Sequence, residues 1–358
     1  MEKLIRPELI AMKAYTPIEP VEILSARSRL PAGKVIKLDG NENPYGCSPG
    51  IRQALADYAY YHIYPDPEQR ELREALAKYV GLDGGHVIAG SGSDELIDLI
   101  LRLFLEPGDK VINCSPTFGM YPFSTEVCGG RVIEVARDEG FAVDVAAVKR
   151  ALDKRTKVIF IASPNNPTGN IISESEILEL VDTGRIVVVD EAYFEFSGST
   201  VVNLVPNYSN LIVLRTFSKW AGLAGLRVGY GIFPVEIVSY LMKIKQPYNV
   251  NAAAQVAVLA TLDDMGYLQD AIKKIIAERE RLFIELGELG WLKPYPSRGN
   301  FILCSVLDGN AEEIWRKLQS KGIFIRYFNV TRLSNCLRTS VGKPEDTDAL
   351  IGALREMG

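Results

Sequence analysis

The run Arg185-Ile186-Val187-Val188-Val189-Asp190 decides the fold class of this chain. Its four successive apolar residues predict a strand that is buried on both faces, because a half-exposed strand would alternate apolar with polar residues. Strands of this kind belong to a mostly parallel sheet that is covered by helices on its two sides. We therefore expect an α/β fold.

Similar runs recur along the chain, and segments with helical periodicity separate them. Residues 68–80 place their apolar side chains on one helical face and stop at Gly81. Ser91-Gly92-Ser93-Asp94 precedes an apolar helix with the spacing of a capping box, and Ser173 with Glu176 forms a second such box. The expected strands are Val87–Ala89, Lys110–Asn113, Arg131–Val135, Lys157–Ala162, Arg185–Asp190, Leu211–Arg215 and Val228–Phe233.

The pattern changes near residue 234. A long helical stretch over 263–289 is followed by three short strands, near 300–305, 323–326 and 336–340. These elements predict a second, smaller α+β domain. We expect a large domain over 34–245, and a small domain over 246–358 that includes the N-terminal arm 1–33. The arm should pack on the small domain or on a neighbouring subunit.

Composition excludes several classes of protein. The chain has 358 residues, 47% of them hydrophobic, and a net charge of −5 without a Lys/Arg block, so neither nucleic acid nor a membrane is an expected partner. The N-terminus lacks the apolar core of a secretory signal, which favours a cytoplasmic location. Five scattered cysteines and two histidines fit neither a disulfide framework nor a metal site.

Polar motifs follow several of the expected strands. Ser93 and Asp94 open a helix whose free N–H groups would favour a phosphate, although by itself this motif is better explained as a plain helix cap. The loop Ser163-Pro164-Asn165-Asn166-Pro167-Thr168-Gly169 is a turn and alone carries no function. Asp190 ends a buried strand, at the edge where open α/β sheets bind ligands, and could pair with a pyridinium nitrogen.

The stretch from Thr216 to Tyr230 carries the strongest chemical signal. Lys219 lies between Ser218 and Trp220 and is followed by glycines and alanines that allow the backbone to approach closely. Desolvation in such a site lowers the pKa of a lysine and frees a nucleophilic amine. Arg227, eight residues further on, could hold a phosphate. Arg338 in a short strand could grip a carboxylate, although an ordinary ion pair is equally compatible with it.

These motifs, in this order, resemble the aminotransferases of pyridoxal-phosphate fold type I, class I/II, over nearly the whole chain from Leu38 to Gly342. Finer features are similar to the histidinol-phosphate aminotransferase branch of that family. They are the stretches Leu38–Gly46, Tyr64–Asp66, Ser115–Tyr121 and Cys336–Arg338. The resemblance implies a large domain with a mostly parallel sheet flanked by helices, and a smaller α+β domain.

The resemblance also implies pyridoxal 5'-phosphate as cofactor and a role for each matching residue. Lys219 would bond covalently to the cofactor, and Asp190 would pair with its ring nitrogen. Tyr193 and Asn166 would bond the phenolic oxygen of the ring, and Phe118 would stack on the ring. The expected phosphate ligands are Ser93, Asp94, Thr216, Ser218 and Arg227, together with Tyr64 from a neighbouring subunit, which implies a homodimer with shared active sites.

For the substrate, the resemblance implies that Arg338 grips the amino-acid carboxylate and that Tyr15 and Arg326 lie near the far end. Asn41 is a further candidate for substrate contact. The implied reaction transfers the amino group between L-histidinol phosphate and 2-oxoglutarate or glutamate. The sequence departs from the family pattern at two places. Phe118 replaces the more frequent Tyr, and Trp220-Ala221 follows the lysine. Both departures concern the pocket wall rather than the reaction.

Several alternatives stay open at this point. An aromatic amino-acid aminotransferase or a phosphothreonine decarboxylase of the same fold would share these motifs. A binding or regulatory module could keep the cofactor without turnover, but would normally carry a DNA-binding element that this sequence lacks. A nicotinamide dehydrogenase is disfavoured because the third glycine of its fingerprint is missing.

Overall fold

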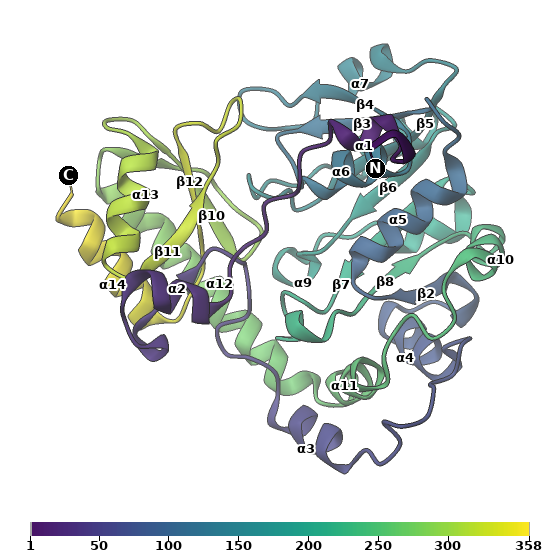
Figure 1. Ribbon diagram of the computed structural model, residues 1–358, viewed down its shortest axis with the longest axis horizontal. Helices are drawn as coiled ribbons and strands as arrows, with labels where there is room; N and C mark the ends of the chain where they lie inside the picture. The colour runs from purple at the N-terminus through teal and green to yellow at the C-terminus, as the bar shows by residue number, and fades with distance from the viewer. Residues whose placement is uncertain (1, 358) are drawn as a thin grey trace.

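The computed structural model describes residues 2–357 and contains two β-sheets (Figure 1). The larger sheet has seven strands in the order β2-β8-β7-β6-β5-β3-β4. Neighbouring strands from β3 to β7 run parallel, whereas β8 runs antiparallel to both β2 and β7. The strands are β2 (Val87–Gly90), β3 (Lys110–Ser115), β4 (Arg131–Ala136), β5 (Thr156–Ala162), β6 (Ile186–Asp190), β7 (Leu211–Thr216) and β8 (Gly229–Ile232). The expected mostly parallel sheet is therefore confirmed.

Helices cover both faces of this sheet. Those in the same part of the chain are α3 (Pro49–Asp57), α4 (Arg70–Val80), α5 (Ser93–Phe104), α6 (Met120–Val127), α7 (Val145–Ala151), α8 (Glu174–Val181), α9 (Phe194–Ser197), α10 (Val235–Ile244) and α11 (Ala252–Asp263). Val188 packs in a cluster with α5, α6 and α10, whereas Val187 and Val189 pack in the cluster on the opposite face, with α4, α8 and α11. The strand β6 is thus buried on both faces, as its sequence predicted.

The smaller sheet has the strand order β1-β11-β12-β10-β9. Its elements are β1 (Ile36–Leu38), α12 (Met265–Glu288), β9 (Leu292–Pro294), β10 (Phe301–Val306), α13 (Ala311–Ser320), β11 (Ile323–Tyr327), β12 (Cys336–Ser340) and α14 (Pro344–Arg355). β1 pairs in parallel with β11. It therefore joins the smaller sheet, although it falls within the range 34–245 assigned to the large domain. Three residues are too short for a periodic signal, and the domain boundaries remain a proposal.

The N-terminal arm contacts both the part of the molecule around the larger sheet and the part around the smaller sheet (Figure 1, purple). Its helices are α1 (Pro7–Ile10) and α2 (Val21–Ser28). Near α1, Arg6 Nη1 donates a 2.9 Å hydrogen bond to the carbonyl oxygen of Val127, the last residue of α6. Further along, Arg326 of β11 donates a 3.1 Å bond to the Thr16 carbonyl oxygen. The arm thus packs on the large sheet's helices as well as on the small sheet. Short 3₁₀ turns are η1 (Glu2–Leu4), η2 (Ala32–Lys34), η3 (Gly84–His86), η4 (Val202–Asn207) and η5 (Ala224–Leu226).

The two expected capping boxes have different outcomes. Ser173 and Glu176 form the box at the start of α8 as predicted. At α5 the prediction was wrong, because the helix begins at Ser93 with Gly92 as its N-cap and without a side-chain cap. Gly92 has φ +79°, and a Cβ there would lie 2.6 Å from Nη2 of Arg227. Glycine is needed at this position so that the guanidinium can reach the start of α5.

In the described part of the chain, the helices do not combine the length and the hydropathy that a membrane span requires.

Candidate active site

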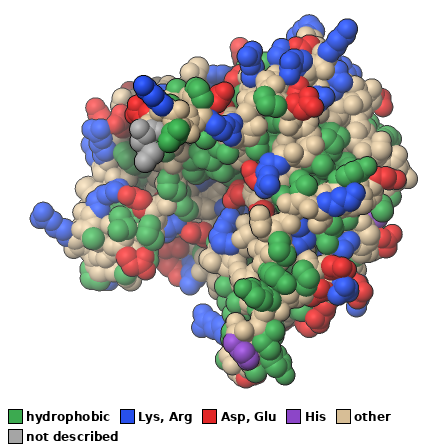
Figure 2. Space-filling model, turned by 45° about the vertical axis from the view of Figure 1, so that its right-hand side comes forward, with side chains coloured by type: hydrophobic (Ala, Val, Ile, Leu, Met, Phe, Trp, Pro, Cys, Tyr) green, Lys and Arg blue, Asp and Glu red, His purple; other side chains and the backbone are tan. Residues whose placement is uncertain are grey.

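A cavity opens at the carboxyl ends of the parallel strands. Its inner part has about 600 Å³ of empty space, which includes space open to solvent, and is bordered by the last residues of β5, β6 and β7, namely Ala162, Asp190 and Thr216. An outer part of about 1700 Å³, which includes space open to solvent, continues toward the smaller sheet. The space-filling view shows a hollow between the two sides of the molecule (Figure 2). This is the edge at which open α/β sheets bind ligands.

The predicted site residues gather around this cavity, with one exception. The inner part is lined by Ser93, Asp94, Phe118, Asn166, Asp190, Tyr193, Thr216, Ser218, Lys219 and Arg227. The outer part adds Tyr15, Asn41, Arg326 and Arg338. Tyr64 lines neither part; its side chain is 78% exposed and its ring stacks on Tyr248 with the centroids 4.5 Å apart. Motifs that are far apart in the sequence thus meet because parallel strands end at one edge.

Lys219 projects into the cavity from the turn after β7. Its Nζ donates a 3.0 Å hydrogen bond to the carbonyl oxygen of Gly40. Desolvation lowers the pKa of Lys219 to about 8, and the nearby guanidiniums of Arg338 and Arg227 act in the same direction. A substantial fraction of this amine is therefore neutral near physiological pH, which is the form that attacks a carbonyl.

Asp190 is a buried carboxylate that faces the same cavity. Tyr121 donates a 2.6 Å hydrogen bond to its Oδ2, and the Ala192 backbone N–H donates a 3.1 Å bond to its Oδ1. Burial raises the pKa of Asp190 to about 6, and these two bonds oppose that rise. Among residues 2–357, no Lys, Arg or His side chain forms an ion pair with this carboxylate within 4.0 Å. A cationic group of a ligand, such as a protonated ring nitrogen, fits the position.

Donors for a phosphate lie on another side of the inner cavity. The first turn of α5 presents the backbone N–H groups of Ser93 and Asp94, which have no partner within the helix. The hydroxyl oxygens of Thr216 and Ser218 are 3.0 Å apart, and both residues line the cavity. Arg227 Nη2 lies 2.8 Å from Oδ2 of Asp94. Backbone N–H groups, hydroxyls and a guanidinium together match the chemistry of a phosphate ester.

Tyr193 and Asn166 are both tied to neighbouring side chains. Asn41 Nδ2 donates a 2.9 Å bond to the Tyr193 hydroxyl, and Arg338 Nη1 donates a 2.5 Å bond to Oδ1 of Asn166. Asn41 has φ +53° and is fastened to the smaller sheet by two hydrogen bonds with the Ser340 hydroxyl. Asn41, a candidate for substrate contact, lines the outer cavity while its amide fixes the Tyr193 hydroxyl, and its contact with substrate stays a prediction.

Arg338 and Arg326 lie side by side across β11 and β12, because they are register partners in the small sheet. Arg338 is 5% exposed, and its Nε has no hydrogen-bond partner among residues 2–357. Burial lowers the pKa of Arg338 to about 10, and Arg326 adds repulsion. Two adjacent guanidiniums at the outer cavity form a site for an anionic group. Tyr15 reaches the same cavity from the N-terminal arm.

Sequence reasoning assigned no role to Tyr121, Arg137 or Asn165. Arg137 donates to the carbonyl oxygens of Cys114 and Phe141 and to Oδ1 of Asn165, which also accepts from the Thr117 hydroxyl. This network joins the loop that carries Phe118 to the loop that carries Asn166. Its members come from separate segments, so no local pattern in the sequence could have identified it.

Comparisons with known proteins agree with this geometry. The family model described as "Aminotransferase class I and II" matches residues 33–354. The histidinol-phosphate aminotransferase of Dehalococcoides mccartyi is 52% identical over 358 residues, which is 100% of this chain and 99% of that protein. Histidinol-phosphate aminotransferase 1, chloroplastic, of Arabidopsis thaliana is 48% identical over 99% of this chain and 86% of its own length.

Solved structures with the same fold include a crystal structure of histidinol-phosphate aminotransferase from Sinorhizobium meliloti in complex with pyridoxal-5'-phosphate. It superposes with a TM-score of 0.88 at 27% sequence identity, and covers 98% of this chain and 96% of that chain. The match extends over both sheets, because it spans nearly the whole length. The chain belongs to the class I and II aminotransferase family.

Proposed function

We propose that this chain is a pyridoxal-phosphate-dependent aminotransferase that moves an amino group between L-histidinol phosphate and 2-oxoglutarate. The observation that carries the proposal is the placement of Lys219 and Asp190 on one cavity, with phosphate donors on a further side of it. The names of the relatives, which are 48–52% identical over nearly the whole chain, support this choice of substrate over an aromatic amino acid or phosphothreonine.

When bound, pyridoxal phosphate withdraws electrons from the bonds at the substrate α-carbon. Lys219 would hold the cofactor covalently, and its neutral amine could move a proton at the substrate α-carbon. Asp190 would keep a proton on the ring nitrogen. Tyr193 and Asn166 would hold the phenolic oxygen of the ring, and Phe118 would cover one face of it. The start of α5, Thr216, Ser218 and Arg227 would hold the phosphate.

The two substrates differ in where their anionic groups lie. Glutamate carries an α-carboxylate, whereas histidinol phosphate has no α-carboxylate and carries in its place a CH2 group that is esterified with phosphate. Arg338 and Arg326 are adjacent in the sheet, so one pair of guanidiniums can meet either group. Tyr15, at the edge of the same cavity, would border the far end of the substrate.

The proposal includes a homodimer in which Tyr64 reaches the phosphate site of the neighbouring subunit. The high exposure of Tyr64 and its absence from the cavity of its own chain support that role. A cytoplasmic location is also part of the proposal.

Spectroscopy with defined substrates tests the proposed function. The purified holoprotein should show a visible absorption band that glutamate removes and 2-oxoglutarate restores. Histidinol phosphate should remove the band at least as efficiently, whereas Lys219→Ala should show neither change while it remains folded. Faster reaction with phenylalanine or tyrosine would favour the aromatic alternative, and release of carbon dioxide from phosphothreonine would favour the decarboxylase. A purified protein that lacks the band after incubation with pyridoxal phosphate would refute the cofactor assignment.

A further inference from the structure

A buried ion pair lies on the face of the large sheet opposite the inner cavity. Arg215 Nε and Nη2 donate bonds of 3.0 and 2.8 Å to Oε2 of Glu191, and the two side chains are 3% and 2% exposed. Oε1 of Glu191 accepts a 2.8 Å bond from the Val201 N–H. The Thr200 hydroxyl donates to Oε2 at 2.8 Å. The carboxylate is therefore fully engaged on its own side of the sheet and does not line the cavity.

Each member of this pair is the chain neighbour of a cavity residue. Glu191 follows Asp190, and Arg215 precedes Thr216. Because successive side chains of a strand point to opposite faces, anchoring Glu191 and Arg215 on one face fixes Asp190 and Thr216 on the other. The ring of Phe194, which follows the cavity residue Tyr193, lies 3.6 Å below the Arg215 guanidinium. Three cavity residues thus have a neighbour in the same buried cluster.

Backbone pairing also connects the ends of β6 and β7 near the cavity. Asp190 and Leu214 are register partners at the ends of β6 and β7, and the Glu191 N–H donates a 2.8 Å bond to the Leu214 carbonyl oxygen. The ion pair continues this pairing one residue further along, because it joins Glu191, just after β6, to Arg215 of β7. It joins the two strand ends at the point where one presents the carboxylate and the other a hydroxyl to the cavity.

We propose that Glu191 and Arg215 are positioning residues that hold Asp190 and Thr216 in the geometry that binds the cofactor. The inference rests on the proposed function, because it assigns these two neighbours to the ring nitrogen and the phosphate.

Stability alone does not account for an ion pair at this position. Replacing a buried ion pair by well-packed hydrophobic residues of similar volume is often neutral or stabilising, because the charges lose their hydration when they are buried. A bidentate arginine–carboxylate contact differs from apolar packing in its fixed direction. Fixed direction is what the placement of two reacting groups requires, since a displacement of about 1 Å in a site can reduce turnover about a hundredfold.

The test uses the holoprotein and its cofactor-free form. The main variant is Glu191→Gln with Arg215→Met, which removes both charges together and keeps an acceptor for the Val201 N–H. Arg215→Lys keeps the charge but loses the bidentate contact. The measurements are the unfolding temperature, the dissociation constant for pyridoxal phosphate, kcat and KM, and amide hydrogen exchange at the ends of β6 and β7 without cofactor.

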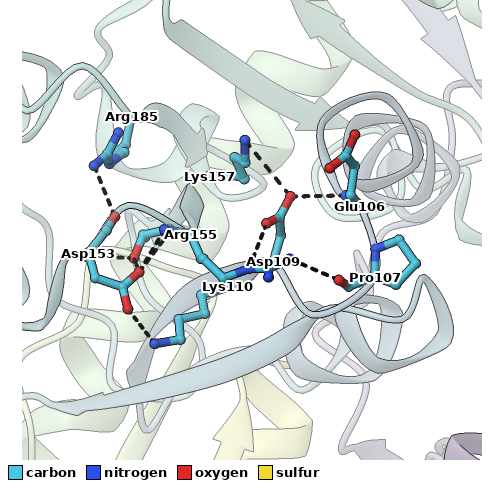
Figure 3. Close-up of polar contacts among 9 residues, drawn as sticks. Glu106, Pro107, Asp109, Lys110, Asp153, Arg155, Lys157 and Arg185 are labelled. Carbon is cyan, nitrogen blue, oxygen red and sulfur yellow. Dashed lines mark hydrogen bonds and ion pairs between the residues drawn. The ribbon is translucent and has the colours of Figure 1, made fainter.

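A buried carboxylate that pairs with two partly exposed cations at the opposite end of the same sheet provides the control (Figure 3). Asp109, which precedes β3, is 3% exposed and lies 3.3 Å from Arg155 Nε and 3.9 Å from Lys157 Nζ. Its Oδ2 also accepts a 3.0 Å bond from the Glu106 N–H. Asp109→Asn removes a buried charge of the same kind without touching the carboxyl ends of the strands.

The double variant should unfold near the wild-type temperature yet bind the cofactor about tenfold more weakly, with kcat reduced about tenfold and KM changed much less. Its strand-end amides should exchange faster in the cofactor-free protein. Arg215→Lys should recover part of each loss, and Asp109→Asn should show none. A folded double variant with wild-type cofactor binding, kcat and exchange would overturn this inference alone. A wild-type protein that does not bind pyridoxal phosphate would instead overturn the proposed function.

Discussion

The hydroxyl of Tyr121 donates a 2.6 Å hydrogen bond to Oδ2 of Asp190, and both side chains are buried. Tyr121 lies on α6, and its ring stacks in parallel on Phe160 of β5 with the centroids 4.7 Å apart. The donor therefore has little freedom to move. A hydrogen bond to the ionised form favours that form, so Tyr121 opposes the effect of burial on the pKa of Asp190. Tyr121 thus keeps the carboxylate charged.

Tyr121→Phe should reduce kcat about tenfold, because a hydrogen bond to a charged group contributes about 1.5–3 kcal/mol. The pKa of Asp190 should rise above its present value of about 6, so the acid limb of the kcat profile should shift to higher pH. Steady-state kinetics between pH 5 and 9 measure both effects. Tyr240→Phe, at a side chain that is 54% exposed, serves as control. An unshifted acid limb in Tyr121→Phe would contradict this role.

Asp190 should also make the stability of the cofactor-free protein depend on pH. Its pKa is about 6 in the folded chain and about 3.8 in the unfolded chain, so the unfolded chain binds fewer protons between these values. The free energy of unfolding should therefore fall by about 2 kcal/mol as pH rises from about 4 to 6. Urea unfolding at several pH values measures this decrease in the free energy of unfolding. In Asp190→Asn the part of the decrease that is due to Asp190 should be absent. Parallel curves for the two proteins would refute it.

Lys219 should set the pH dependence of cofactor capture. Because the pKa of this amine is lowered to about 8, its neutral fraction grows as pH rises through that value and levels off above it. The rate at which the cofactor-free protein captures pyridoxal phosphate should follow the same curve. Stopped-flow absorption measures the rate, and borohydride reduction followed by peptide mapping locates the attachment. A label on another lysine, or covalent capture by Lys219→Ala, would exclude the assignment.

The sequence predicted the position of the site better than its internal contacts. Asp190 and Thr216 each follow a run of apolar residues, and parallel strands end at a common edge, so the meeting of their motifs could be anticipated. The bonds from Tyr121 to Asp190 and from Arg215 to Glu191 join segments 69 and 24 residues apart. No local periodicity encodes such pairs, because the fold alone brings them together.

The same reasoning explains where the observed fold differs from the fold predicted from the sequence. β1 consists of only three residues, and the partner strand that orders it lies nearly 300 residues further on. β8 has the apolar pattern of a buried strand, but this pattern does not state direction, and β8 runs antiparallel to both neighbours. At the start of α5, the contact between Gly92 and Arg227 replaced the expected capping box, since the need for a close approach overrode the local preference.

Arg137→Met should destabilise the protein by about 3 kcal/mol, because the buried guanidinium donates to two carbonyl oxygens and to Asn165, and these acceptors would lose their partner. The loop that carries Asn166 should loosen as well, so cofactor affinity should fall. Urea unfolding and cofactor titration measure the two effects. Arg150→Met, at a side chain that is 70% exposed, should change neither. Equal stability of the Arg137 and Arg150 variants would contradict the role of this network.

Mixed dimers of two variants test whether Tyr64 belongs to a site that is shared between subunits. If Tyr64 of one subunit completes the site around Lys219 of the other, Tyr64→Ala and Lys219→Ala should each be impaired as homodimers. In a mixed dimer, however, the subunit with an intact Lys219 receives an intact Tyr64 from its partner. Random exchange of equal amounts makes about half of the dimers mixed, each with one complete site, so activity should return to about a quarter of the wild-type value. Activity that stays at the average of the two separate variants after exchange would show that each site is built within one chain.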